Sequence, residues 1–485
     1  MDTTRLVLGG DRPLGAGEDV VVVDPTTGDV AARIPAADPA QVDAAVSAAA
    51  AAFDAWRDRS QDDRSAALRA VAAHLEAERE ALADLLTVDT GRPRTRNLLY
   101  VDFAATIFRQ YAELARLVNG RFVPSNEPGQ LSITARVPVG VVACLVPWNY
   151  PLDLLAFKAA PALAMGNTVV VKGAPETTRT TLAVGGILAE HLPPGVIGVL
   201  AGGKDVGVAL VAHPAVDMVA FTGSTPAGVE IGIECARRHK LAHLELGGKD
   251  PAIVLDDVDP RVAAKGLVWA AMLNAGQVCT STERAYVHRG VYDVVVEEAV
   301  DLVGRLRVGD PADPATDVGP MRTAAGRAKV LDHLAAAVDA GATILAGGRA
   351  LDRPGFFMEP TVVVDVDHTT ALMREETFGP VLPIVPVADL DEALELAADT
   401  PYGLGASLYT HDPRAVERVF RTLRVGGLWV NDPIVDNPAG LLAGVRASGN
   451  GRELGVEGLF AFTNVRHLHW QLDLQAKPWW YPSEG

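Results

Sequence analysis

The chain is short of cysteine: only Cys144, Cys235 and Cys279 occur among its 485 residues. So few cysteines cannot form a disulfide framework, and their scarcity is typical of a reducing compartment in which a free thiol persists. The first residues lack a basic segment followed by an apolar one, and no apolar run reaches the roughly 18 residues of a membrane span. We therefore expect a soluble, cytoplasmic protein that does not enter a membrane.

Positive charge is also scarce, with 43 basic residues against 61 acidic ones and a net charge of −18. A protein that binds a phosphate backbone needs clustered lysine and arginine to neutralise it, so we expect no nucleic acid partner.

The chain is long enough to bury a large hydrophobic core. A chain of 485 residues predicts two or three domains that share a large core.

Two kinds of hydrophobic pattern divide the chain. Residues 40–57 and 61–87 show helical periodicity, whereas apolar runs alternate with helical segments from Val139 to Leu255 and again from Pro251 to about Val430. Such alternation predicts parallel sheets covered on both faces, with ligands at the carboxyl ends of the strands.

The first set of strands is expected at Val139–Val146, Thr168–Lys172, Val196–Ala201, Val216–Thr222 and Leu244–Leu246, with helices at 152–165, 178–191, 204–212 and 225–239. Arg121–Pro138 and the tail from Ala461 are expected to be extended.

Cys279 is the strongest candidate for a catalytic residue. It lies in the small and polar stretch Asn274–Thr282, which suits an open pocket better than a packed core. Glu245 lies 34 residues upstream between leucines and before a glycine pair, where a carboxylate can be held partly desolvated as a general base. A thiol and a tuned carboxylate together indicate covalent catalysis followed by hydrolysis. Cys144 and Cys235 fit an apolar strand and a helix, so we expect both to be small buried hydrophobes.

Asn149 follows an apolar strand in the motif Val146-Pro147-Trp148-Asn149-Tyr150-Pro151. At the end of that strand its amide is free to donate a hydrogen bond. Together with the backbone N–H of Cys279 it would stabilise the oxyanion formed when the thiol attacks an aldehyde, each donor contributing about 2.7–4 kcal/mol. The alternative is a proline-bracketed turn with asparagine at its centre.

The segment Phe221–Gly228 places Gly223, Ser224 and Pro226 where a strand turns into a helix. The first N–H groups of such a helix attract an anion, and the pyrophosphate of a dinucleotide is the natural ligand. An ordinary serine-capped helix is the alternative.

Taken in order over nearly the whole chain, these motifs resemble those of the NAD(P)-dependent aldehyde dehydrogenase superfamily, of the hydrolytic type that does not transfer the acyl group to coenzyme A. Arg374–Val381 and Gly449–Gly455 extend the resemblance. It implies an α/β fold with two doubly wound parallel-sheet domains and a small β oligomerisation element, and hence a homodimer or homotetramer. The expected parts are a dinucleotide-binding domain at 1–120 and 139–246 with 441–460 packed on it, a catalytic domain at 247–440, and an oligomerisation element at 121–138 and 461–485.

The resemblance also implies roles for individual residues. Lys158 and Glu453 would relay protons from the base, although a structural ion pair is an open alternative. Many relatives carry glutamate three positions after Lys172, whereas this chain has Pro175 there and Glu176 one position later. Without a carboxylate at that point a 2′-phosphate meets less repulsion, which favours NADP, but both NAD and NADP stay open as the cofactor. The expected cofactor-binding residues are Val146, Pro147, Trp148, Lys172, Ala174, Glu176, Gly223, Ser224, Glu245, Leu246, Gly247, Glu376 and Phe378. No catalytic metal is predicted.

The positions that would line the aldehyde tunnel are mostly apolar or aromatic and predict a medium aliphatic or aromatic aldehyde as the substrate. They are Phe103, Tyr150, Phe157, Val278, Thr280 and Leu442. Asp432 and Asp436 leave a cationic aminoaldehyde or betaine aldehyde open if either carboxylate faces the tunnel, the alternative being a solvated loop. A catalytically silent binding protein is a weaker hypothesis, because Cys279, Glu245 and Asn149 are all retained. A thiol esterase is weaker too, because it would not explain the nucleotide motifs.

Overall fold

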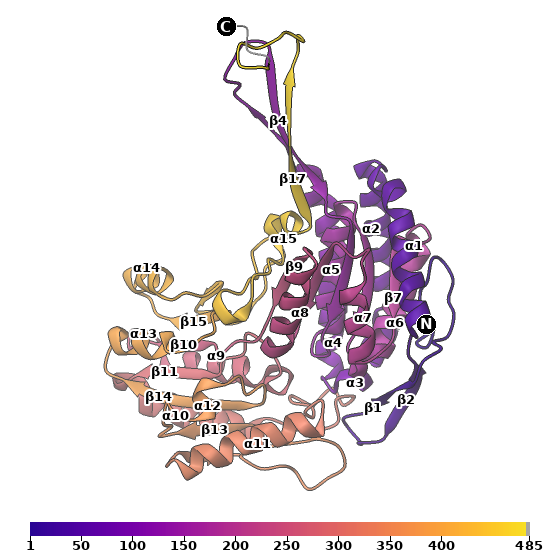
Figure 1. Ribbon diagram of the computed structural model, residues 1–485. Coiled ribbons are helices and arrows are strands. Elements are labelled where there is room, and N and C mark those ends of the chain that lie inside the picture. The colour runs from indigo at the N-terminus through magenta and orange to yellow at the C-terminus, as the bar shows by residue number, and fades with distance from the viewer. Residues whose placement is uncertain (482–485) are drawn as a thin grey trace.

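The structure is a computed structural model and describes residues 1–481. Two large sheets, each accompanied by helices, lie side by side, and a narrow β arm projects from one end (Figure 1). The last four residues of the predicted oligomerisation element, 482–485, lie outside the described part.

The first sheet has five parallel strands in the order β7-β6-β5-β8-β9. They are β5 (Val141–Val146), β6 (Thr168–Gly173), β7 (Ile197–Leu200), β8 (Met218–Thr222) and β9 (Leu241–Glu245). β6 is rich in valine and buried throughout, as expected of a parallel strand covered on both faces. The chain moves outward from β5 to β7 and then returns to β8 on the other side of β5. The carboxyl ends of β5 and β8 therefore border the point where the strand order reverses, which is where ligands bind in open α/β sheets.

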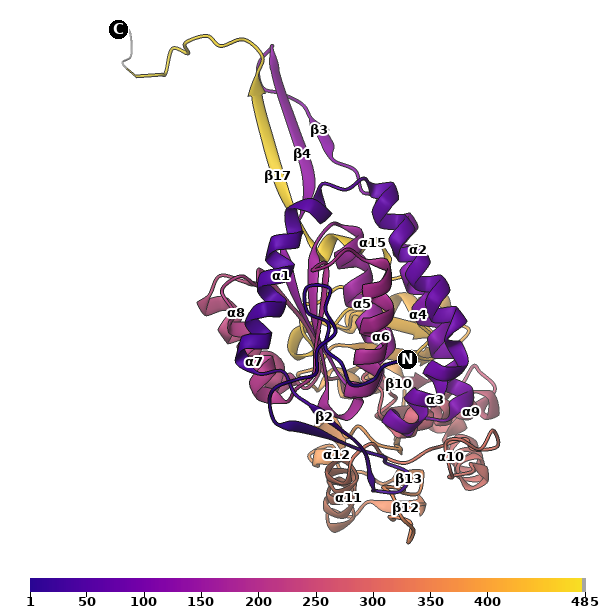
Figure 2. The same cartoon turned by 90° about the vertical axis from the view of Figure 1, so that its right-hand side faces the viewer.

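Helices cover both faces of this sheet. On one face lie α5 and α6, backed by α2, α3 and α4, while α1, α7 and α8 cover the other face (Figure 2). The bounds are α1 (Pro39–Arg57), α2 (Gln61–Ala77), α3 (Arg79–Thr90), α4 (Arg94–Leu114), α5 (Pro151–Ala164), α6 (Thr178–His191), α7 (Lys204–Ala212) and α8 (Thr225–Arg237), with short 3-10 turns η1 (Ala115–Leu117) and η2 (Pro175–Thr177).

Local sequence explains the start of α1 but not the end of α2. α1 starts at a capping box, in which the Asp38 carboxylate accepts from the Gln41 N–H at 2.8 Å and the Gln41 side chain accepts from the Asp38 N–H at 3.2 Å. The predicted helical segment 61–87 is instead divided at Glu78 into α2 and α3. No glycine or proline marks this break, so packing rather than local sequence sets it.

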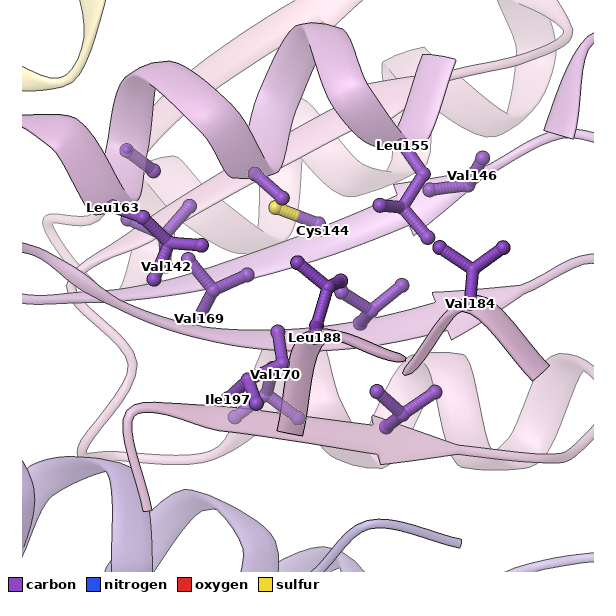
Figure 3. Close-up of a cluster of buried hydrophobic side chains, with 14 of the residues drawn as sticks. Val142, Cys144, Val146, Leu155, Leu163, Val169, Val170, Val184, Leu188 and Ile197 are labelled. Carbon is purple, nitrogen blue, oxygen red and sulfur yellow. The ribbon is translucent and has the colours of Figure 1, made fainter. Parts of the chain in front are cut away.

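Cys144 lies in the core of the first sheet. Its side chain is fully buried among Val142, Leu155, Val169 and Leu188, between the strands and the covering helices (Figure 3). Burial raises the pKa of its thiol to about 12, so it stays protonated. Cys235 on α8 is also buried. Both cysteines are small core residues, as predicted.

The second sheet has seven strands in the order β12-β13-β14-β11-β10-β15-β16, and only the edge strand β12 runs antiparallel to its neighbour. Its strands are β10 (Pro251–Val254), β11 (Arg284–His288), β12 (Thr343–Ala346), β13 (Thr361–Val364), β14 (Val381–Val387), β15 (Gly405–Tyr409) and β16 (Gly427–Val430). The helices of this half are α9 (Pro260–Met272), η3 (Leu273–Gly276), α10 (Arg289–Arg305), α11 (Ala324–Asp339), α12 (Ala371–Arg374), α13 (Leu390–Ala398) and α14 (Pro413–Thr422). A separate core of buried side chains fills it.

The arm is a three-stranded antiparallel sheet that extends away from both halves (Figures 1 and 2). It consists of β3 (Arg121–Val123), β4 (Gln130–Pro138) and β17 (Thr463–Gln471). The tail was expected to be extended from Ala461, but α15 (Gly455–Ala461) ends at that residue and the strand ends at Gln471. Before β17, the chain passes η4 (Arg446–Ser448), and Gly449 forms an isolated β-bridge with Glu245 of the first sheet. Near the N-terminus, β1 (Asp19–Val23) and β2 (Val30–Pro35) form a separate antiparallel hairpin. Within residues 1–481, no helix is long and apolar enough to cross a membrane.

Candidate active site

Cys279 is held by an unusual loop that follows α9. Asn274, Ala275 and Gly276 have φ values of 52°, 54° and 71°, so three successive residues are left-handed. This conformation costs about 1–2 kcal/mol for a residue such as alanine. A Cβ on Gly276 would lie 2.0 Å from the Gly379 carbonyl, so only glycine fits there. The Gln277 side chain stabilises the loop by donating to the Asn274 carbonyl at 2.9 Å.

Two cavities meet at this loop, and Cys279 and Asn149 line both of them. The Asn149 side chain is buried and donates from Nδ2 to the Gln277 carbonyl at 3.2 Å. This bond joins the end of β5 to the Cys279 loop. The two residues thus form a common wall, although Asn149 belongs to the first half of the molecule and Cys279 to the second.

We call the first cavity the glycine cavity; its volume is about 230 Å³. Its walls come from the carboxyl ends of β5, β8 and β9 and from the facing loops of the second half. Besides Cys279 and Asn149, it is lined by Pro147, Trp148, Thr222, Gly223, Ser224, Leu246, Gly247, Gln277, Met321, Thr323, Gly326, Lys329, Glu376, Thr377 and Phe378.

Eight of the predicted cofactor-binding residues line the glycine cavity, namely Pro147, Trp148, Gly223, Ser224, Leu246, Gly247, Glu376 and Phe378. Val146, Lys172, Ala174, Glu176 and Glu245 do not. Val146 is a buried strand residue, and Lys172 to Glu176 lie where the neighbouring strand β6 ends.

The turn between β8 and α8 is shaped to accept an anion. Ser224 is the N-cap of α8, but its side chain makes no capping hydrogen bond, so the first N–H groups of the helix have no acceptor from it. A Cβ on Gly223 would lie 2.4 Å from the end of the Phe221 ring, so a larger residue there would require that ring to move. A helix N-terminus of this kind at the reversal of strand order fits the pyrophosphate of a dinucleotide.

Glu376 faces this turn from the other half. Its carboxylate accepts from the Gly248 N–H at 3.3 Å, and burial together with the nearby Glu283 carboxylate raises the pKa of Glu376 to about 7. Glu283 in turn accepts from the N–H groups of Thr377 at 2.8 Å and Phe378 at 2.9 Å, while it pairs with buried Lys249. This buried ion pair fixes the loop that carries Glu376.

We call the second cavity the aromatic cavity; its volume is about 300 Å³. All six residues predicted to line the aldehyde tunnel do line it. The other lining residues are Arg96, Leu99, Tyr100, Asn149, Asp153, Leu154, Trp269, Leu273, Cys279, Ile434, Val435 and Asp436. The lining residues of α4 are spaced by three and four residues and so share one face of that helix, and the same holds for the lining residues of α5.

The aromatic cavity contains an acidic residue that the sequence analysis missed. Asp153 on α5 is 3% exposed, and neither oxygen of its carboxyl has a hydrogen-bond partner within residues 1–481. Burial raises the pKa of Asp153 to about 8 even though the buried Arg92 lies near enough to lower it. Asp436 also lines the cavity, whereas Asp432 does not, so only one of the two predicted acidic candidates is placed there.

Glu245 lines neither cavity. Its carboxyl is nevertheless near enough to the Cys279 sulfur to contribute to the raised pKa of that thiol. Its carboxyl lies beside Gly451, where a Cβ would meet the Glu245 Oε1 at 2.3 Å. Burial, with a contribution from the Glu453 carboxylate, holds the pKa of Glu245 well above its usual range. The side chain belongs to the end of β9 and is turned toward the segment 444–453.

Lys158 and Glu453 form a buried ion pair behind Glu245. The Lys158 ammonium also donates to the Thr222 hydroxyl at 2.5 Å. The two residues predicted to relay protons are thus in direct contact.

The thiol of Cys279 is not activated in this arrangement. Burial raises its pKa well above the usual range, and the carboxyl groups of Asp250 and Glu376 add to the effect. Activation of Cys279 therefore requires a base or a bound positive charge.

Burial has the opposite effect on Lys172, where it lowers the pKa of the ammonium to about 8.

The chain matches the model described as "Aldehyde dehydrogenase family" over residues 14–468. It is 39% identical to phenylacetaldehyde dehydrogenase of Pseudomonas fluorescens, covering 92% of this chain and 91% of that protein. It is 34% identical to the NADP(+)-dependent succinate-semialdehyde dehydrogenase of Escherichia coli, covering 93% and 94%. Among solved structures, betaine aldehyde dehydrogenase of Staphylococcus aureus in complex with NAD+ has a TM-score of 0.96 at 32% identity, covering 99% of this chain and 97% of that chain.

Proposed function

Because the chain belongs to the aldehyde dehydrogenase family and oxidises aldehydes to carboxylic acids with NAD or NADP, we propose that Cys279, Asn149 and Glu245 carry out this reaction. One observation supports the assignment above all others. Cys279 and Asn149 form the wall between the glycine cavity, which contains the Ser224 turn and Glu376, and the largely apolar aromatic cavity.

In the first step the Cys279 sulfur attacks the aldehyde carbon from the wall of the aromatic cavity, and the thiol proton leaves to a base. The resulting oxyanion is stabilised by the Asn149 amide and the backbone N–H of Cys279. When bound, a nicotinamide cofactor would supply the acceptor for the hydride of this carbon. A thioester on Cys279 remains.

Glu245 then removes a proton from a water molecule, which attacks the thioester and releases the acid and the Cys279 thiol. Burial raises the pKa of Glu245, which makes its carboxylate a stronger base toward water than that of an exposed glutamate. Its side chain must rotate away from Gly451 toward Cys279 to act. In its present orientation it can pass its proton toward the Lys158–Glu453 pair, which we assign as the relay.

For the cofactor, we assign the Ser224 turn to the pyrophosphate, Lys172 and Glu176 to the adenosine ribose, and Glu376 to the nicotinamide ribose. Glu176 is half-buried and its carboxylate lies close enough to raise the pKa of Lys172 against the effect of burial. A carboxylate at this position would bind ribose hydroxyls and repel a 2′-phosphate. This favours NAD over NADP.

The walls of the aromatic cavity favour a medium aliphatic or aromatic aldehyde. Phe103 and Phe157 pack edge to face with centroids 6.0 Å apart, as do Tyr100 and Tyr150 at 4.9 Å. Asp153 supports a second candidate, an aldehyde with an amino group at its far end, because an ammonium would supply the hydrogen bond that the buried carboxyl lacks.

We also propose that the arm joins copies of the chain into a homodimer or homotetramer. The side chains of Phe122, Val465, Leu468 and Trp470 are exposed on its strands, which is typical of a surface that is covered by a partner.

The test is the formation of reduced cofactor from aliphatic, aromatic and ω-amino aldehydes, with NAD and NADP in separate reactions. The wild-type protein should turn over at least one class. Cys279→Ala should abolish this activity, and Glu245→Gln should give one burst of reduced cofactor without further turnover, because the thioester is not hydrolysed. Asp153→Asn should lower kcat/KM for the amino aldehyde about tenfold and leave butanal unaffected if the second candidate is right. Activity that persists in Cys279→Ala would disprove the assignment.

A further inference from the structure

Arg322 is a buried cation that takes no part in the proposed reaction. It lies between Met321 and Thr323, which both line the glycine cavity, just before α11. Its side chain is 2% exposed. A charged residue this deeply buried is costly unless its environment stabilises it.

The environment of Arg322 comes from the opposite half of the molecule. Its Nη2 donates to the backbone carbonyl of Glu176 at 2.6 Å. Burial lowers the pKa of Arg322, and the carboxylates of Glu176, Asp89 and Asp24 counteract this effect. Its Nε finds no acceptor within residues 1–481, so the bond to the Glu176 carbonyl is the main anchor of the guanidinium.

The backbone of Arg322 is tied to the Cys279 loop. Its N–H donates to the Gln277 side-chain oxygen at 2.8 Å. The Gln277 carbonyl accepts the Asn149 amide at 3.2 Å, and Gln277 lies two residues before Cys279. A continuous set of hydrogen bonds therefore runs from the turn after β6, through Arg322 and Gln277, to the common wall of both cavities.

We propose that Arg322 is a positioning residue that couples the Lys172–Glu176 turn to the Cys279 loop. This inference rests on the proposed function, in which that turn binds the adenosine end of the cofactor and the loop carries the nucleophile. A nucleotide that holds the turn then also fixes Gln277 and Asn149, so the reactivity of the Cys279 thiol depends on whether the distant nucleotide site is filled. Coupling of this kind requires a physical link between the two sites, and Arg322 supplies it.

The experiment measures alkylation of Cys279 by iodoacetamide, with and without NAD, in wild-type protein, Arg322→Met and Arg322→Lys. Cys279→Ala identifies the labelled site by mass spectrometry. In the wild type, saturating NAD should change the labelling rate severalfold. In Arg322→Met this change should disappear, the concentration of NAD that half-saturates binding should rise about tenfold, and the KM for the aldehyde should stay within about twofold. Arg322→Lys and added methylguanidinium should restore part of the response.

Arg179→Met is the matched control, because Arg179 approaches the same Asp89 carboxylate at 3.4 Å but is not tied to Gln277. It should retain the response to NAD. A lower melting temperature in Arg322→Met with an unchanged response to NAD would show a structural role only and overturn the proposal. So would a wild-type labelling rate that NAD does not affect. Labelling needs no turnover, so failure of the coupling is distinguishable from failure of the proposed reaction, which would appear as no reduced cofactor with any aldehyde.

Discussion

The two cavities that meet at Cys279 are built in different ways. The glycine cavity lies at strand ends and short loops, where Gly223 and Gly247 permit close approach. The aromatic cavity is lined mainly by residues of α4, α5 and neighbouring loops. An added side chain at Gly223 or Gly247 would meet neighbouring atoms, whereas the side chains on the two helices can be altered one residue at a time.

The largest effect is expected where the cavities share a wall. Asn149→Ala removes the proposed oxyanion donor and should lower kcat about 10²–10³-fold for every aldehyde and with either cofactor. It also removes the bond to the Gln277 carbonyl, so its melting temperature must be measured alongside the steady-state kinetics. A loss restricted to one aldehyde class would place Asn149 in the aromatic cavity alone.

A smaller effect, on the KM for the cofactor but not on the KM for the aldehyde, is expected from Gly247→Ala. The added Cβ would lie 2.7 Å and 2.8 Å from the two oxygens of the Glu376 carboxylate, which must move away and lose its bond to the Gly248 N–H. The KM for the cofactor should rise about tenfold while the KM for the aldehyde stays within about twofold. Gly203→Ala is the control, because nothing lies within 4 Å of its Cβ. Equal changes in both KM values would contradict the separation of the two sites.

The smallest effect is a pH dependence confined to the cofactor. Burial lowers the pKa of Lys172 to about 8 from 10.5, so its charge is lost as the pH rises through 8. The KM for NAD should therefore rise about threefold between pH 7 and pH 9, and this increase should be absent in Lys172→Met. Because the unfolded state holds the Lys172 proton more tightly, the same residue makes the folded state more stable as the pH rises from 8 to 10.5. Thermal unfolding and kinetics measured over this range should thus change in opposite directions, and a KM that is flat with pH would exclude Lys172 from the cofactor site.

Much of the fold could be predicted because its signals are local. β6 begins with four successive β-branched residues, Thr168–Val171, and α6 and α7 have the predicted bounds. The break between α2 and α3 could not be predicted, since no residue at Glu78 stops a helix. β9 begins three residues before its predicted start because its pairing with β8, rather than its short apolar run, fixes its length.

The residues of the candidate site also differ in whether the sequence alone can predict them. Short motifs predict Cys279, Asn149 and the Gly223–Ser224 turn as site residues, since each motif depends on the conformation of a few neighbouring residues. Asp153 and Arg322 carry no such signal. An aspartate on a helix and an arginine near a proline look ordinary until the residues opposite them are known.

The sequence by itself determined the type of chemistry, because a thiol in a small polar loop, an amide after a buried strand and a glycine turn before a helix are local arrangements. Only the tertiary structure decided which side chains face which cavity. It turned Glu245 toward Gly451, left the Asp153 carboxyl without a partner and placed Arg322 against the Glu176 carbonyl. The physical reason is that burial and hydrogen-bond partners are set by residues far apart in the chain, such as Glu176 and Arg322, which approach one another only when the two halves pack together.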